Sequence, residues 1–427
     1  MFEASIKKSY LVLIGVILTI VALVACAEGE AEDASPLARP PATTEDPVVT
    51  PTIPDEPVVF TIGNLTDITG PGAGSVAMVD YALDDLAEYY NENNLIPGVE
   101  LKVIEYDQQM DPARDIPGYE WLLDKGADVI FTPVPATPTT LKSRADRDEV
   151  VLFAVAASKE GILPPGYVFN LGVDPEHEAY TLLQWIAEND WDYQTKGPAK
   201  IGGAAWAEPY SATFLDAVKE YCSAHPDQFE WEGGFLTGLG FTWTSEVAAL
   251  KDCDYVFPGV VMGAFVKQYR EAGHTEAKFV GADSSAAFLG TVQWDDIDEM
   301  LFVMYARWWN EEDEIIDLAR QLVHEYHPGD ADEIIRSGIG YLAIHQVDVM
   351  LSIIADAAEA VGPHNLDSQS IYDTATSFVL MSDGVQRVSF SEEKRNATDS
   401  YGIYEARSTE EDLFRVHDEW CPAIKNP

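Results

Sequence analysis

Residues 150–157 have the sequence VVLFAVAA, a continuous apolar run that predicts a strand buried on both faces of a sheet. Similar runs precede it: VVFTIGNLTD at 58–67, VELKVIEY at 99–106 and DVIFTP at 128–133. Segments with apolar residues at helical spacing separate these runs, at 75–93, 116–125 and 137–148. Buried strands that alternate with amphipathic helices predict an α/β protein with a parallel sheet that helices cover on both faces.

The same alternation restarts after a short strand at 167–171. The second block predicts strands at 200–205, 232–236, 255–261, 278–281 and 301–305, and helices at 177–189, 211–224, 245–252 and 264–273. The chain then becomes mainly helical over 311–327 and 331–361, and two further strands are expected at 386–391 and 401–406. Two such blocks in tandem predict two doubly wound lobes.

Short motifs follow the predicted strands in a characteristic order. They are Thr69-Gly70-Pro71, Tyr106-Asp107 with Asp111-Pro112, AVAASKE at 154–160, Tyr210 before a helix, and QYREAG at 268–273 followed by FVGAD at 279–283. Together they resemble the type I periplasmic binding protein fold, and within it the leucine/isoleucine/valine-binding family of ABC-transporter solute receptors. The resemblance covers about residues 58–406. It implies three crossings between the lobes, which we expect near Asn170, Tyr305 and Asp399.

These crossings define the predicted domains. Lobe 1 comprises 58–170 plus 306–398, and lobe 2 comprises 171–305 plus 399–427. Before them, Lys7 and Lys8 are followed by an uncharged apolar run at 10–25, which predicts an export signal at 1–25. Leu-Val-Ala-Cys at 23–26 resembles a bacterial lipobox, which implies cleavage before Cys26 and lipidation of its thiol. An ordinary signal peptide and a membrane anchor are the alternatives.

The segment 26–57 is acidic and rich in proline, so we expect a disordered tether that holds an extracytoplasmic body near the bacterial membrane. The 427 residues include 26 Lys+Arg and 73 Asp+Glu, a formal net charge of −47. Such a chain lacks the cations that bind nucleic-acid phosphates, and anionic membrane surfaces repel it.

Three cysteines remain beyond Cys26. Cys222 and Cys253 are a possible disulfide pair, because they lie in neighbouring segments of lobe 2; three buried unpaired thiols are the alternative. The spacing of Cys and His does not suggest zinc, so we expect no metal and no cofactor.

Ligands of open α/β sheets bind beyond the carboxyl ends of the strands. By resemblance, Ala156 and Ser158 hold the polar groups of the ligand, and Ala136 and Thr137 lie in a turn that opens a helix and binds its carboxylate. Pro135 in this turn lacks an N–H, so Thr137 is the expected replacement contact. The other expected ligand-binding residues are Asp283 for an ammonium group, Tyr210 for a hydroxyl contact, Trp206 for the cleft wall and Thr69 for the side-chain pocket.

Each assignment has a structural alternative: Asp283 as a turn or cap residue, Ser158 as an N-cap, and Tyr210 and Trp206 as packing residues. The resemblance implies a non-enzymatic, lipid-anchored receptor that delivers a small ligand, by default a branched-chain or related amino acid, to an ABC permease and its ATPase. The alternatives are an amide or small-molecule sensor with the same fold and, from another class, a lipid-anchored hydrolase.

Overall fold

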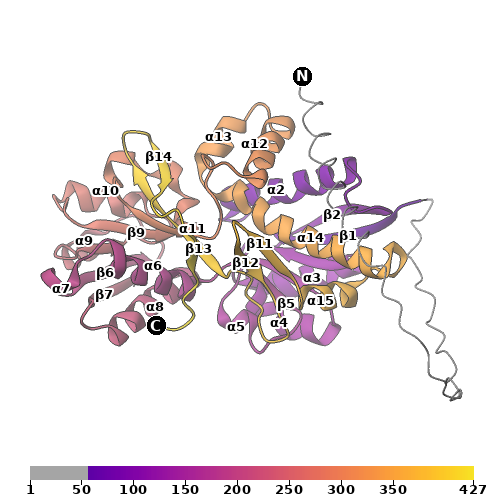
Figure 1. The fold of residues 1–427 in the computed structure, drawn as a ribbon, viewed down its shortest axis with the longest axis horizontal. Coiled ribbons are helices and arrows are strands. Elements are labelled where there is room, and N and C mark those ends of the chain that lie inside the picture. Colours follow the sequence, from indigo (N-terminus) through magenta and orange to yellow (C-terminus); the bar gives the residue numbers. More distant parts are fainter. Residues whose placement is uncertain (1–55) are drawn as a thin grey trace, which may run out of the picture. The chain divides into compact units, whose positions relative to one another are not determined.

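The structure is a computed structural model, and it describes residues 56–427. The predicted signal peptide 1–25, Cys26 and nearly all of the predicted tether lie outside the described residues. The first sheet contains five parallel strands in the order β2-β1-β3-β4-β5 (Figure 1). Their bounds are β1 Val58–Thr66, β2 Val99–Asp107, β3 Val129–Thr132, β4 Leu152–Ala156 and β5 Val168–Val173.

Helices cover this sheet, and we refer to the whole as lobe 1. Four helices lie between its strands: α2 Ala73–Glu92, α3 Asp115–Asp124, α4 Thr137–Asp148 and α5 Lys159–Ile162. Four more come from later in the chain: α12 Glu314–Tyr326, α13 Ala331–Ser337, α14 Ile344–Val361 and α15 Ser368–Ala375. Helix α14 packs against α2, and in Figure 1 it runs beside the strands of the first sheet.

Helix α14 is apolar because it belongs to the core. With the turn before it, Gly340–Val361, it is long and apolar enough by composition to cross a membrane, but 72% of its apolar window is buried inside the structure. Its apolar residues Val347, Met350, Leu351 and Ile354 are buried while Asp356 and Glu359 are exposed, so a core helix accounts for this segment.

The second sheet is mixed, in the order β14-β13-β10-β9-β8-β6-β7 with the short β15 Cys421–Pro422 beside β13. Its parallel strands are β6 Ala199–Trp206, β7 Phe229–Thr237, β8 Tyr255–Phe257, β9 Lys278–Ala282 and β10 Leu301–Met304. Two antiparallel strands complete it, β13 Ser400–Arg407 and β14 Asp412–Arg415. The helices of this lobe 2 are α6 Pro175–Asn189, α7 Tyr193–Lys196, α8 Pro209–Ala224, α9 Thr244–Ala249, α10 Gly263–Glu271 and α11 Asp283–Ala286.

The parallel first sheet and the mainly parallel second sheet confirm the predicted fold class. Strand β12 Val385–Ser389 corresponds to the strand predicted at 386–391, and it forms a separate hairpin with β11 Val379–Ser382. Strands β11, β14 and β15 and helix α15 were not predicted. The first strand of the hairpin escaped prediction because it is short and two of its side chains, Val379 and Met381, are exposed. This strand is therefore not a continuous buried run.

Backbone hydrogen bonds join the segments that pass between the lobes. The N–H of Asn170 donates to the carbonyl of Arg395 at 2.7 Å, and the N–H of Ala397 donates to the carbonyl of Asn170 at 2.8 Å. The hydroxyl of Thr398 donates to the carbonyl of Gly172 at 2.8 Å. Two segments more than 200 residues apart thus run side by side where the chain leaves lobe 1.

The possible disulfide between Cys222 and Cys253 is not formed, because both cysteines are free and buried. Cys222 is on α8, and Cys253 follows α9. The crossover direction reverses at the edge strand β7, so right-handed connections place α8 and α9 on opposite faces of the sheet. The sheet therefore separates the helix of one thiol from the helix that leads to the other.

Candidate functional site

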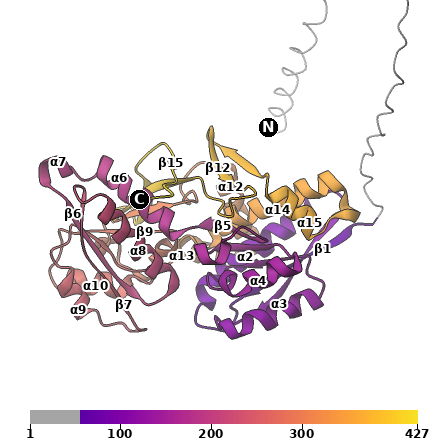
Figure 2. The ribbon, with the colours of Figure 1, turned by 90° about the horizontal axis from the view of Figure 1, so that it is seen from below.

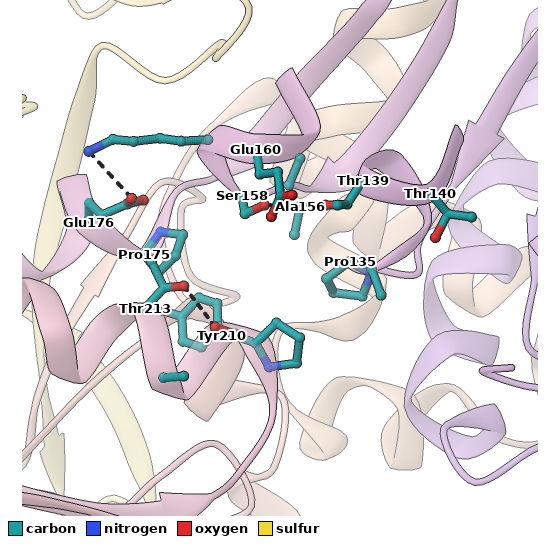
Figure 3. Close-up of a pocket in the computed structure, with 15 residues that line it drawn as sticks. Pro135, Thr139, Thr140, Ala156, Ser158, Glu160, Pro175, Glu176, Tyr210 and Thr213 are labelled. Atoms are coloured by element: carbon teal, nitrogen blue, oxygen red, sulfur yellow. Dashed lines mark hydrogen bonds and ion pairs between the residues drawn. The ribbon is translucent and has the colours of Figure 1, made fainter. Parts of the chain in front are cut away.

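Loops at the carboxyl ends of β3, β4 and β6 surround a cavity of about 550 Å³ between the lobes, which we call the outer cavity (Figure 3). Its lobe 1 wall comprises Pro135, Ala136, Thr139, Thr140, Ala156, Ala157, Ser158, Lys159 and Glu160. Its lobe 2 wall comprises Pro175, Glu176, Pro209, Tyr210, Ala212 and Thr213. Four of the predicted site residues, Ala136, Ala156, Ser158 and Tyr210, are therefore brought together here.

The lobe 1 wall offers hydroxyl groups and the start of a helix. The hydroxyl oxygens of Thr139 and Ser158 lie 3.4 Å apart, and Figure 3 shows the two side chains close together at the open space. Helix α4 begins after Ala136, and no side chain caps it. The N–H of Thr137 donates to the carbonyl of Val134 and Pro138 has no N–H, so the donors that suit a carboxylate are the later N–H groups of this first turn and the nearby hydroxyls.

The lobe 2 wall is fixed by the first turn of α8. The Glu208 carboxylate caps this helix by accepting from the N–H groups of Tyr210 at 2.8 Å and Ser211 at 2.7 Å. Between the walls, the ammonium of Lys159 forms an ion pair with the Glu176 carboxylate at 3.3 Å, as Figure 3 shows. Because this pair joins the two walls, the cavity is bounded by both lobes.

A second space of about 260 Å³, the inner cavity, adjoins the outer one, since Pro135, Ala156 and Tyr210 line both. Most of its lining is apolar, including Val76, Val79, Met110, Pro133, Val155, Val260, Ala287, Phe288 and Ile339. Its polar lining includes Glu208, Asp283, Ser284 and Gln346. The combination suits a compact apolar group attached to a polar one.

Asp283, which lines this inner cavity, neighbours a second buried carboxyl group, that of Glu178. Asp283 is 2% exposed and Glu178 is 0% exposed, and Asp283 Oδ1 and Glu178 Oε1 are buried with no hydrogen-bond donor among the described residues. The other Asp283 oxygen accepts from the N–H of Tyr305 at 2.9 Å, and Glu178 accepts from the Tyr210 hydroxyl at 2.5 Å.

Burial raises the pKa of Asp283 to about 7, and burial together with the Asp283 charge raises the pKa of Glu178 well above its usual range. With both pKa values raised, the pair retains a proton near neutral pH, and that proton can be shared by the two carboxyl groups.

The other predicted site residues lie elsewhere. The Thr137 hydroxyl donates to Asp115 at 3.3 Å inside lobe 1. The Trp206 ring nitrogen donates to the carbonyl of Gly240 at 2.7 Å, and the Thr69 hydroxyl donates to Asp107 at 2.6 Å. These three side chains do not line the outer or the inner cavity, so only the remaining five predicted residues border the cleft.

Three residues that border the site were not predicted, namely Glu176, Thr139 and Tyr305, and neither was Glu178, which accepts from the Tyr210 hydroxyl. Glu178 lies in a correctly predicted helix, where an acidic residue suggests a solvated face. Among 73 acidic residues, no sequence signal distinguishes a buried one. Thr139 lies two residues beyond Thr137, so the predicted turn was right but the side chain facing the cavity was not identified. Across residues 56–427, no group of three or more His, Cys, Asp and Glu side chains is arranged to hold a metal ion.

The sequence and the fold were compared with those of known proteins. A family model described as periplasmic binding protein matches residues 59–411. Among solved structures, a branched-chain amino acid ABC transporter protein from Thermus thermophilus with bound valine is 17% identical, with a TM-score of 0.73; the match covers 85% of this chain and 96% of that one.

Other matched structures bind different ligands. A solute-binding protein from Rhodopseudomonas palustris in complex with 3,4-dihydroxybenzoic acid is 16% identical, with a TM-score of 0.70 over 86% of this chain and 99% of that one. A fatty acid ABC transporter substrate-binding protein from Thermomonospora curvata is 15% identical, with a TM-score of 0.67 over 88% and 94%. No curated protein matches the sequence. Because these structures are only 15–17% identical to this chain, their similarity shows a shared fold and does not identify the ligand.

Proposed function

Because the chain belongs to the periplasmic binding protein family, we propose that it is an extracytoplasmic receptor that binds a small solute between its lobes and delivers it to an ABC permease. The observation that carries this proposal is the cleft itself, whose two walls come from different lobes. A ligand that contacts both walls binds the closed state more tightly than the open one, so it drives hinge closure. We place the hinge at the predicted crossings near Asn170, Tyr305 and Asp399.

We further propose that the ligand is a branched-chain or related apolar amino acid. Its carboxylate would accept hydrogen bonds from Ser158, Thr139 and the start of α4, and its side chain would fill the inner cavity. Its ammonium would lie near Asp283 and donate to the Tyr210 oxygen, which retains lone pairs while its hydrogen is donated to Glu178. An ammonium at this position favours the ionised form of both carboxyl groups.

An aromatic carboxylate is the second candidate ligand, and the burial of the Asp283–Glu178 pair, which raises both pKa values, favours it. A ligand without an ammonium leaves the Asp283–Glu178 pair protonated, so binding does not require loss of that proton. The apolar lining of the inner cavity accepts a ring as well as an aliphatic side chain. The pH dependence of binding separates the two classes.

The attachment of the protein to the membrane is also part of the proposal. We propose that Cys26 carries the lipid and that 26–57 is the tether. A sensor with the same fold remains the alternative role. Uptake of the bound solute by cells with and without the protein separates the roles, since only a transport receptor changes uptake.

A thermal-shift screen tests the proposed ligand class. The protein is unfolded and refolded to remove ligand carried through purification, and is then heated with amino acids, aromatic acids, amides and sugars. A ligand at about 100 times its Kd adds roughly 2.7 kcal/mol to stability, enough to raise the melting temperature by a few degrees. A shift by apolar amino acids alone supports the first ligand, and a shift by aromatic acids alone supports the second. A shift by sugars alone contradicts both.

A further inference from the structure

A third cavity, of about 490 Å³, lies apart from the cleft beneath the β11–β12 hairpin, and we call it the hairpin cavity. Its walls come from the hairpin, α12, α14 and the segment around Trp420. Tyr305 lines both the hairpin cavity and the inner cavity of the cleft. The N–H of Tyr305 donates to Asp283 on the cleft side, and its carbonyl accepts from Arg387 on the hairpin side.

Two polar side chains in this cavity have a buried nitrogen without a hydrogen-bond partner, and Arg387 is one of them. Its Nη2 donates to Tyr305 and its guanidinium lies over the Trp420 ring, but its Nη1 is buried and has no hydrogen-bond partner. Within the part of the chain that the structure describes, no carboxylate forms an ion pair with it. The neighbouring Arg307 is paired instead with Glu311, Asp313 and Asp383, and Arg415 is paired with Glu311.

His345 on α14 supplies the second such group. Its Nε2 is buried and has no hydrogen-bond partner, and burial beside Arg387 and Arg307 lowers its pKa to about 3. The imidazole is therefore neutral at pH 7, and its Nε2 can carry the ring proton and donate. Two buried donors from different elements thus line the same cavity.

The acidic residues around this cavity already have partners or are exposed. Asp313 pairs with Arg307 at 2.8 Å, and Asp348 accepts from the Tyr90 hydroxyl at 3.0 Å. Glu314 is exposed at the rim. The rest of the lining is largely apolar: Leu171, Ile315, Leu318, Val349, Leu380, Met381, Val388 and Trp420. An occupant therefore needs an anionic acceptor group on an apolar body.

We propose that the hairpin cavity is a second binding site, for a small organic carboxylate with an apolar chain or ring. The carboxylate accepts from Arg387 Nη1 and His345 Nε2, and the apolar body packs between α12 and the hairpin. An Arg–carboxylate pair in a buried setting is a strong, charge-assisted contact. The site is separate from the proposed cleft site, so it does not depend on the solute that the cleft binds.

Hexanoate is the probe, and hexanamide is the control of the same shape without charge. The full chain carries Ala136→Trp throughout, because this residue borders the outer cavity and a large ring there obstructs the cleft. Calorimetric titration reports binding. We expect one hexanoate per chain, binding at least about tenfold weaker for hexanamide, and the same loss for hexanoate when Arg387→Gln is added.

Leu318→Trp fills the cavity from the opposite wall, so it tests the site without removing the arginine. It too should abolish hexanoate binding, while circular dichroism shows an intact fold. Three results overturn the proposal: no saturable binding of hexanoate, equal binding of hexanoate and hexanamide, or binding that survives both Arg387→Gln and Leu318→Trp.

Discussion

Asp283→Asn should make the protein more stable at alkaline pH while it removes the charge proposed to hold a ligand ammonium. The asparagine oxygen can still accept from the N–H of Tyr305, as the carboxylate does at 2.9 Å. Its amide group can donate to Glu178, which replaces the shared proton with a permanent donor. The variant therefore keeps these hydrogen bonds, but its residue 283 no longer gains or loses a proton with pH.

The expected change in the free energy of unfolding with pH can be calculated from the pKa of Asp283, which burial raises from 3.8 to about 7. A carboxyl group with a raised pKa in the folded state contributes stability below its unfolded pKa, and that contribution is lost as the pH rises through the folded pKa. The full loss is about 4 kcal/mol. Between about pH 5 and pH 8, the wild type should lose about 2 to 3 kcal/mol of unfolding free energy through this group.

Urea unfolding at these two pH values measures the effect. Other buried acids also titrate, such as Asp80, whose pKa burial raises to about 6; the difference between wild type and Asp283→Asn isolates the pair. Asp216→Asn, on the exposed face of α8, is the matched control and should follow the wild type. A gap between wild type and Asp283→Asn that is the same at both pH values would refute the shared-proton argument.

Three other outcomes can be measured. If the ligand is an amino acid, its affinity should rise between about pH 6 and pH 8 and calorimetry should show proton release, because the ammonium displaces the proton of the Asp283–Glu178 pair; a flat profile contradicts an ammonium at this position. Burial raises the pKa of Cys222 and Cys253 to about 12, so neither should react with a thiol reagent at pH 8 until the protein is unfolded without reductant; a missing pair of thiols after unfolding would reveal a disulfide. The net charge of −47 predicts that added NaCl raises the urea midpoint through screening of self-repulsion; a midpoint that falls with salt contradicts this.

The sequence predicts the central parallel strands, such as β3 and β8, well because their residues are buried on both faces, whereas the edge strands β2 and β7 alternate with exposed residues. The run at 150–157 leaves no room for a polar face, and the structure makes it β4 at Leu152–Ala156 with four of five residues fully or nearly fully buried. Strand β11 and helix α15 lack such a signal. Helix α15 does carry a capping box between Asp367 and Ser370, a local pattern that could have located its start.

The site was partly predictable for a topological reason. Loops after parallel strands meet at one edge of a sheet, so Ala136, Ala156 and Ser158 come together whatever their side chains contact. Tyr210 follows β6 of the second sheet and joins them because the carboxyl ends of strands in both sheets border the outer cavity. The direction of a single side chain depends on its neighbours across the fold. Thr137 turns toward Asp115 because α3 packs against α4, and no pattern along the chain contains that contact.

The central claim is that a small solute binds between the two lobes. Calorimetric titration of the strongest ligand from the screen tests it most directly, with wild type, Ala136→Trp and, as a control on the exposed end of the same helix, Arg147→Trp. We predict one ligand per chain for wild type and Arg147→Trp, and no measurable binding for Ala136→Trp. Equal affinity for all three proteins would contradict a binding site in this cleft.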